Sequence, residues 1–227
     1  MNAPDIGIDW DGIDSVFLDM DGTLLDLHFD NHFWLEHVPR RYAETKGISA
    51  EEGKALLHSR YRDIQGTLNW YCVDHWSREL GLDILLLKQE VEHLIAVHPH
   101  VMDFLEWISR LGKRRVLVTN AHQKTLAMKL ERTRLAGHFE RIISSHELGE
   151  AKESADFWPL LQAMEPFDPE RTLFVDDNLD VLRAARDYGL SWTIAVLEPD
   201  STRAPQDSPS GIAAIRNFSE LLPPGLR

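Results

Sequence analysis

The chain carries the sequence Ser15-Val16-Phe17-Leu18-Asp19-Met20-Asp21-Gly22-Thr23 close to its start. The first half of this stretch is short, apolar and rich in β-branched and aromatic residues, which is typical of a buried strand. Four later runs share that character. We therefore predict five strands, at residues 15–19, 115–119, 141–144, 172–176 and 191–196.

Segments with helical periodicity lie between the later strands. Apolar residues recur every three or four positions in residues 101–111, 126–135 and 179–188, and a glycine follows each segment within two residues. Alternating strands and helices predict right-handed crossovers and a parallel sheet that is covered by helices on both faces. The predicted fold class is α/β, with a Rossmann-like parallel sheet.

Residues 28–97 contain no run with the features of a strand. Helices are predicted at residues 30–46, 49–65, 69–80 and 83–97, and short connections between them favour an up-and-down bundle. We expect this bundle to be an all-α cap domain inserted after the first strand. The α/β core would then comprise residues 1–27 and 98–227. Residues 200–211 are rich in serine, proline and aspartate, so we expect a surface loop there.

The composition excludes several classes of function. The 227 residues carry 37 acidic and 24 basic side chains, a formal net charge of −13, which disfavours binding to nucleic acids and to anionic membranes. No apolar run approaches the roughly 18 residues of a membrane span. The single cysteine, Cys72, has no partner for an internal disulfide, which fits a reducing compartment. We predict a cytoplasmic protein, and the sequence indicates neither an oligomeric state nor a protein partner.

Polar side chains stand at the ends of the predicted strands. Each residue alone is more often a turn or helix-capping residue than a catalytic one. In a parallel sheet, however, the carboxyl ends of the strands meet at one edge, where ligands bind. Clustered carboxylates repel one another unless a cation neutralises them, and oxygen ligands favour Mg²⁺. The residues at this predicted edge are Asp19, Asp21, Thr119, Asn120, Lys152, Asp176 and Asp177.

The order of these motifs resembles the haloacid dehalogenase superfamily of Mg²⁺-dependent phosphohydrolases, and the resemblance extends from Ser15 to the end of the chain. It implies that Asp19 attacks phosphorus and forms an aspartyl-phosphate. Asp21 would protonate the leaving alcohol and then activate water. A carboxylate is a competent nucleophile where cations withdraw charge from the phosphoryl oxygens.

The resemblance also assigns the other motif residues. Thr119 would hold a phosphoryl oxygen together with the backbone N–H groups of Met20 and Asn120, and Lys152 would neutralise the nucleophile and the transferring group. The metal ligands would be the side chain of Asp19, the backbone carbonyl of Asp21, Asp177 directly and Asp176 through water. Asp180 competes with Asp177 for this role, since other members use a spacing of four residues. Its common alternative role is in the first turn of a helix.

The predicted cap suggests the kind of substrate. A cap of this size closes over a small molecule and excludes water. The strings 29–34, 66–72 and 119–122 resemble a bacterial subgroup described as GMP/IMP nucleotidases, which implies purine 5′-monophosphates as substrates. Asn31, Asn69 and His122 are candidate substrate contacts, although capping is the more common role of the two asparagines. The arginines at 40, 41, 60 and 62 could meet a second anionic group, but solvated helix faces are their more common place.

Two alternative functions remain open. The same core would serve a sugar phosphate phosphatase, a phosphoglycolate phosphatase or a phosphomutase. A catalytically silent module that binds a phosphorylated ligand is a further alternative, disfavoured because all the motif residues are present.

Overall fold

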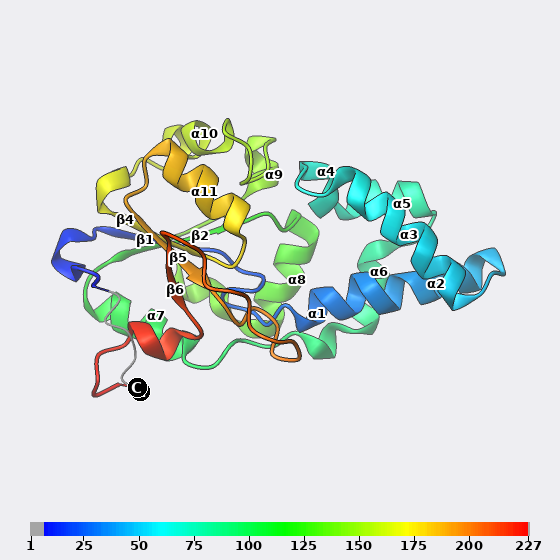
Figure 1. Cartoon of the computed structure of the whole chain (residues 1–227), viewed down its shortest axis with the longest axis horizontal. Helices are drawn as coiled ribbons and strands as arrows, with labels where there is room; N and C mark the ends of the chain where they lie inside the picture. The colour runs from blue at the N-terminus through cyan, green and yellow to red at the C-terminus, as the bar shows by residue number, and fades with distance from the viewer. Residues whose placement is uncertain (1–6, 227) are drawn as a thin grey trace.

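The computed structural model describes residues 7–226 and is built on a parallel sheet of six strands in the order β3-β2-β1-β4-β5-β6 (Figure 1). The strands are β1 (Ser15–Leu18), β2 (Arg114–Thr119), β3 (Arg141–Ser144), β4 (Thr172–Asp176), β5 (Trp192–Val196) and β6 (Ala213–Ile215). The predicted fold class is confirmed, and the five predicted strands agree with the structure to within one residue at each end.

The first strand lies at the centre of the sheet. Phe17 pairs with Val116 of β2 on one side and with Phe174 of β4 on the other. All four residues of β1 are buried, which explains why the strand is apolar without alternation. Figure 1 shows α10 and α11 on one side of the sheet and α7 on the other.

The helices fall into two groups along the chain. Those inserted between β1 and α7 are α1 (His28–His32), α2 (Val38–Lys46), α3 (Ala50–Ile64), α4 (Leu68–Tyr71), α5 (Val73–Leu80) and α6 (Ile84–Glu90). Those of the α/β part are α7 (Val101–Arg110), α8 (Gln123–Thr133), α9 (Ser145–Leu148), α10 (Phe157–Met164) and α11 (Leu179–Tyr188). In Figure 1 the inserted helices lie beside the sheet rather than on either of its faces.

The first predicted helix of the insert is interrupted by a π-helical turn, η2 (Phe33–His37), between α1 and α2. The backbone N–H of Val38 donates to the carbonyl of Phe33, five residues earlier. Pro39 follows directly and has no N–H to continue the usual ladder. The wide turn therefore accommodates the proline without ending the helix.

Two further predicted helices are shorter than expected. The helix predicted at 69–80 breaks at Cys72, whose backbone is extended and whose Sγ accepts the N–H of His75 at the start of α5. The helix predicted at 83–97 ends at Glu90, and η3 (Glu92–Leu94) follows. Here the chain returns to the sheet.

The two crossings between insert and sheet run side by side. Leu25 and Val97 form an antiparallel bridge, the Asp26 N–H donates to the Ala96 carbonyl at 2.9 Å, and the His98 N–H donates to Leu24 at 2.9 Å. If the helix continued to Val97, these backbone groups would form hydrogen bonds within the helix instead of with the other crossing.

The C-terminal part contains the strand that the prediction missed. β6 has three residues and pairs with β5 through Ile215 and Val196. Residues 204–208 are irregular and exposed, as expected for a surface loop, but Asp200 is buried. Among residues 7–226, no helix is long and apolar enough to cross a membrane.

Candidate active site

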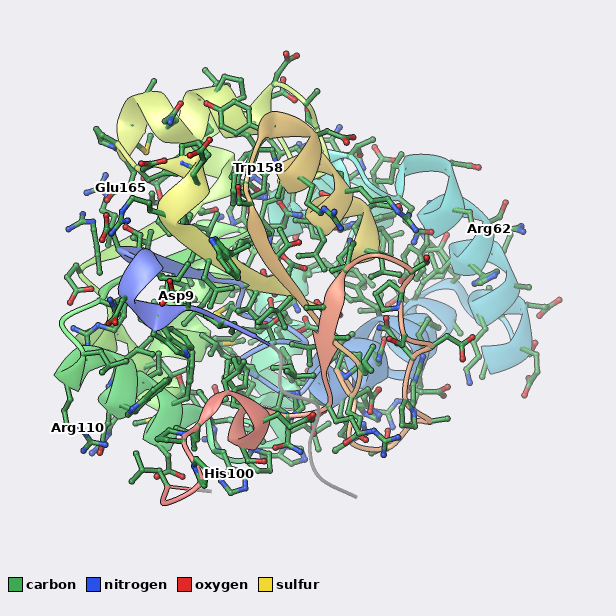
Figure 2. The ribbon with its side chains drawn as sticks, turned by 60° about the vertical axis from the view of Figure 1, so that its left-hand side comes forward. Asp9, Arg62, His100, Arg110, Trp158 and Glu165 are labelled. Atoms are coloured by element: carbon green, nitrogen blue, oxygen red, sulfur yellow. The ribbon has the colours of Figure 1, made fainter. Side chains whose placement is uncertain are left out.

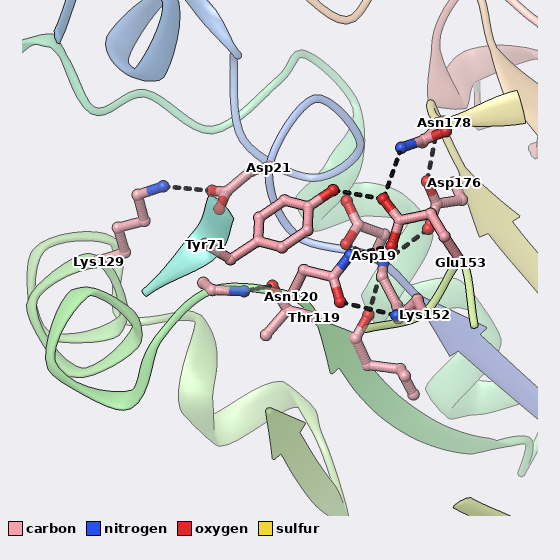
Figure 3. Close-up of polar contacts among 12 residues, drawn as sticks. Asp19, Asp21, Tyr71, Thr119, Asn120, Lys129, Lys152, Glu153, Asp176 and Asn178 are labelled. Atoms are coloured by element: carbon pink, nitrogen blue, oxygen red, sulfur yellow. Dashed lines mark hydrogen bonds and ion pairs between the residues drawn. The ribbon is translucent and has the colours of Figure 1, made fainter. Parts of the chain in front are cut away.

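Groups from the ends of β1, β2 and β4 meet at the side chain of Lys152 (Figure 3). Asp19 follows β1 directly, Asp176 ends β4, and Lys152 lies after α9. The Lys152 Nζ donates to Asp176 Oδ2 at 2.7 Å and to the carbonyl of Val118 at 3.1 Å, and it also bonds to Asp19 Oδ1. One ammonium thus joins β1, β2 and β4.

The position of Lys152 is set by its own backbone. Its N–H donates to Asn120 Oδ1 at 3.0 Å, and its carbonyl accepts the indole N–H of Trp158 at 3.2 Å. The side chain is only 2% exposed. Burial opposes its charge, but the two carboxylates outweigh that effect and raise the pKa of Lys152, so the ammonium stays charged.

Asp19, Asp176 and Asp177 form an acid cluster. One carboxylate oxygen from each lies within 4.8 Å of the others. Burial, opposed by Lys152, raises the pKa of Asp19 to about 7. Burial and the charges of Asp176 and Asp19 raise the pKa of Asp177 well above its usual value. Three carboxylates around a single ammonium carry excess negative charge, so the cluster fits a divalent cation that prefers oxygen ligands.

Asp180 does not join this cluster. Its side chain is 74% exposed and pairs with Arg183 at 2.6 Å, while its backbone N–H is capped by Asn178. The structure therefore places Asp177, and not Asp180, beside Asp19 and Asp176. It leaves Asp180 in the first turn of α11.

Asp21 points away from the cluster toward the insert. Lys129 of α8 donates to Asp21 Oδ1 and to Asp30 Oδ2, both at 2.6 Å, and Lys88 of α6 donates to Asp30 Oδ1 at 2.9 Å. Burial, opposed by Lys129, raises the pKa of Asp21 to about 6. Burial also opposes the ionisation of Asp30, but Lys129 and Lys88 outweigh it and lower its pKa to about 2. This chain of charges ties Asp21 to the helical insert.

Thr119 is buried at the end of β2 and lines the same cavity as Asp19. Its Oγ accepts the N–H of Ala121 at 3.0 Å. Because Thr119 Oγ accepts this bond through a lone pair, its own O–H remains free to donate to an acceptor in the cavity.

A cavity of about 280 Å³ lies between the strand ends and the insert. Of the predicted substrate contacts, Asn31, Asn120 and His122 line it together with Thr119 and Lys152, whereas Asn69 is exposed and is absent from the lining. Asn31 donates to Asp200 Oδ2 at 2.6 Å. The aromatic residues of the lining are Trp34, Trp70 and Tyr71.

Figure 2 shows Arg62 on α3, at the outer side of the insert. The side chain is exposed, as expected for a solvated helix face.

Glu153 was not singled out from the sequence. It accepts from Tyr71 of the insert at 2.5 Å, from Asn120 at 2.9 Å and from Asn178 at 3.3 Å. Figure 3 shows these groups converging on its carboxylate. Its one sequence signal is its place next to Lys152. Lys88 and Lys129 were missed as well, because no feature distinguishes them from other helical lysines.

Comparison with known proteins agrees with this geometry. Residues 13–189 match the family described as haloacid dehalogenase-like hydrolase. The GMP/IMP nucleotidase YrfG of Escherichia coli (strain K12) is 42% identical over 196 residues, which cover 86% of this chain and 88% of that protein. The chain belongs to the haloacid dehalogenase-like hydrolase family, as the motifs predicted.

Two more distant relatives extend the comparison. A phosphoglycolate phosphatase of Pseudomonas syringae pv. tomato is 25% identical over 181 residues, which cover 78% of this chain and 66% of that protein. The crystal structure of a HAD phosphatase from Thermococcus onnurineus has the same fold. Its TM-score is 0.78 at 21% identity, and the match covers 92% of this chain and 96% of that one.

Proposed function

We propose that this protein is a Mg²⁺-dependent phosphomonoester hydrolase that converts purine 5′-mononucleotides, GMP and IMP foremost, to nucleoside and phosphate. The observation that carries the proposal is the cavity in which Asp19, the acid cluster and Lys152 face aromatic residues of the insert. The 42% identity to a GMP/IMP nucleotidase supports the choice of substrate. The proposal includes a cytoplasmic location, in keeping with a lone thiol.

Asp19 is the proposed nucleophile. Its carboxylate attacks phosphorus, an Asp19–O–P bond forms, and the bond from phosphorus to the 5′-oxygen breaks. Lys152 holds Oδ1 of Asp19 and so fixes the direction of the carboxylate. Asp19, Asp176, Asp177 and the backbone carbonyl of Asp21 are the groups that would hold Mg²⁺, and the ion would supply positive charge against the phosphoryl oxygens.

Asp21 is the proposed acid and base. A carboxyl with a pKa of about 6 holds a proton in a useful fraction of molecules near neutral pH and gives it to the leaving 5′-oxygen. The resulting carboxylate then takes a proton from the water that attacks phosphorus, which releases phosphate and restores Asp19. Lys129 keeps Asp21 in place through Oδ1.

Substrate binding divides between core and insert. We assign the phosphoryl oxygens to the Thr119 hydroxyl and the Lys152 ammonium, because both residues line the cavity. Trp34, Trp70 and Tyr71 offer aromatic surface for a purine, with Asn31, Asn120 and His122 as polar contacts. In this scheme residues 28–97 act as a cap over a core of residues 1–27 and 98–227, and Asn69 has no part.

The test is phosphate release from a panel of esters with and without Mg²⁺. We expect hydrolysis of GMP and IMP to require Mg²⁺, to stop with EDTA, and to exceed hydrolysis of AMP, phosphoglycolate and sugar phosphates in kcat/KM. The Asp19→Asn protein is the control for a contaminating phosphatase.

Each other outcome excludes part of the proposal. Sugar phosphates or phosphoglycolate turned over tenfold faster than GMP and IMP would contradict the nucleotidase assignment. Hydrolysis without metal would contradict the mechanism. Binding of nucleotides without any phosphate release would indicate the silent binding module instead.

A further inference from the structure

A second group of potential metal ligands lies where the insert meets the α/β part. Cys72 stands between α4 and α5, His122 precedes α8, and His146 lies in α9. One ligand atom from each, the thiol sulfur or a ring nitrogen, lies within 4.8 Å of the other two. The two imidazole rings pack edge to face, with their centroids 4.9 Å apart.

His146 has a ring nitrogen with nothing bound to it. Its Nε2 is buried and has no hydrogen-bond partner in the described structure. A metal-binding histidine presents one ring nitrogen to the metal, and the unpartnered Nε2 of His146 is suited to that role. A buried nitrogen without a partner is otherwise costly.

Cys72 faces the two histidines from the insert. Cys72 is half-buried, and among residues 7–226 the one hydrogen bond given to its sulfur comes from the backbone N–H of His75, at 3.4 Å. Asp74 Oδ2 lies 3.8 Å from His122 Nε2, but Asp74 is outside the group and pairs through Oδ1 with Lys124 at 2.6 Å. One sulfur and two imidazole nitrogens are a donor set that suits zinc, with water in the fourth position.

We propose that Cys72, His122 and His146 form a Zn²⁺ site, separate from the acid cluster, that joins the helical insert to the α/β part. The acid cluster offers only carboxylate oxygen and suits a hard cation, whereas this group offers sulfur and nitrogen. Ligand atoms around tetrahedral zinc lie about 3.5 Å apart. The side chains therefore need to approach one another by only a small distance.

The site has a consequence for the cavity. His122 lines it, and Cys72 directly follows Tyr71, which also lines it. Bonds from zinc to both sides would hold the insert against the α/β part. Zinc would therefore slow turnover by opposing the opening that releases product.

The experiment is a Co²⁺ titration of metal-free protein in excess Mg²⁺, followed by displacement with Zn²⁺. Excess Mg²⁺ occupies the acid cluster, and a thiolate-to-cobalt charge-transfer band reports sulfur ligation. Because the chain has one cysteine, such a band can come only from Cys72. We expect the band to saturate at one Co²⁺ per chain and to disappear when Zn²⁺ is added.

Two variants and one control make the result specific. Cys72→Ser keeps an acceptor for the His75 N–H, so α5 retains its cap, but it removes the sulfur. His146→Ala removes the unpartnered nitrogen. Each should weaken Zn²⁺ binding at least tenfold by calorimetry in excess Mg²⁺, while His58→Ala, which removes an exposed histidine of α3, should leave it unchanged.

Inhibition by Zn²⁺ in excess Mg²⁺ should be relieved in Cys72→Ser and retained in His58→Ala. No charge-transfer band in the wild-type protein would overturn the proposal. Equal Zn²⁺ affinity in the wild type, Cys72→Ser and His146→Ala would overturn it as well.

Discussion

The backbone of Gly22 and the side chain of Asp177 lie in close contact at the acid cluster. Gly22 has a φ of 86°, which favours glycine, and a Cβ atom placed there would lie 2.5 Å from Asp177 Oδ2. The glycine after Asp21 therefore makes room for a carboxylate from β4's end. From the sequence, Asp177 and Asp180 remained alternatives, because only the close approach of two distant segments distinguishes them.

The choice between these two aspartates predicts different effects of matched substitutions. Asp177→Asn removes a charge from the acid cluster and should raise the Mg²⁺ concentration for half-maximal activity at least tenfold. Asp180→Asn changes an exposed side chain outside the cluster and should leave the Mg²⁺ concentration for half-maximal activity unchanged. Mg²⁺ titrations of phosphate release measure both. An equal effect of the two substitutions would contradict the placement of the metal.

The raised pKa values in the cluster predict how Mg²⁺ binding depends on pH. In the folded protein Asp19 keeps its proton up to about pH 7, whereas in the unfolded chain it loses it near its usual value of 3.8. Between these values the proton favours the folded state and competes with the metal. Mg²⁺ should therefore raise the melting temperature more at pH 8 than at pH 5.5. A larger rise at pH 5.5 would contradict this account.

At the scale of elements, periodicity placed the helices but did not find their interruptions. Pro39 was visible in the sequence, yet either a kink or a π turn would accommodate it, and the structure has the π turn η2. The break at Cys72 puts Tyr71 in reach of Glu153. This contact joins residues that are 82 positions apart in the chain, and local sequence does not encode it. The same holds for the early end of α6, where backbone groups pair with the other crossing.

The link between α8 and the insert depends on one buried cation. Lys129→Met leaves Asp21 and Asp30 in a largely buried place with only Lys88 nearby, and we expect it to lower the free energy of unfolding by about 3–5 kcal/mol. Lys124→Met, on the same helix but half exposed, should cost less than about 1 kcal/mol. Urea unfolding of both variants measures the difference. Equal losses would indicate that the buried network adds no stability.

At the scale of the whole molecule, the strand order explains why distant residues meet. β1 lies between β2 and β4, so Asp19 has Thr119 on one side and Asp176 on the other. The alternation of strands and helices predicted this sheet, and with it the residues at its edge. β6 was missed because three residues carry too little pattern to separate a strand from a loop.

The net charge of −13 also takes on a local meaning. Taken over the whole chain, this charge disfavours binding to nucleic acids and to anionic membranes. In the structure, part of the acidity is gathered into a cluster of three aspartates around Lys152. An acidic protein that binds a phosphate ester depends on a cation at this place, because its overall field repels the substrate.

The nucleophilic role of Asp19 is the central claim, and trapping the covalent intermediate tests it most directly. In Asp21→Asn the second step lacks its base, while an aryl phosphate with a good leaving group needs no acid for the first step. We therefore expect rapid acid quenching with Mg²⁺ to yield protein heavier by one phosphoryl group, with the modification on Asp19 by peptide mass spectrometry. A phosphoryl group on another residue, or aryl alcohol released while the protein mass stays unchanged, would contradict the account.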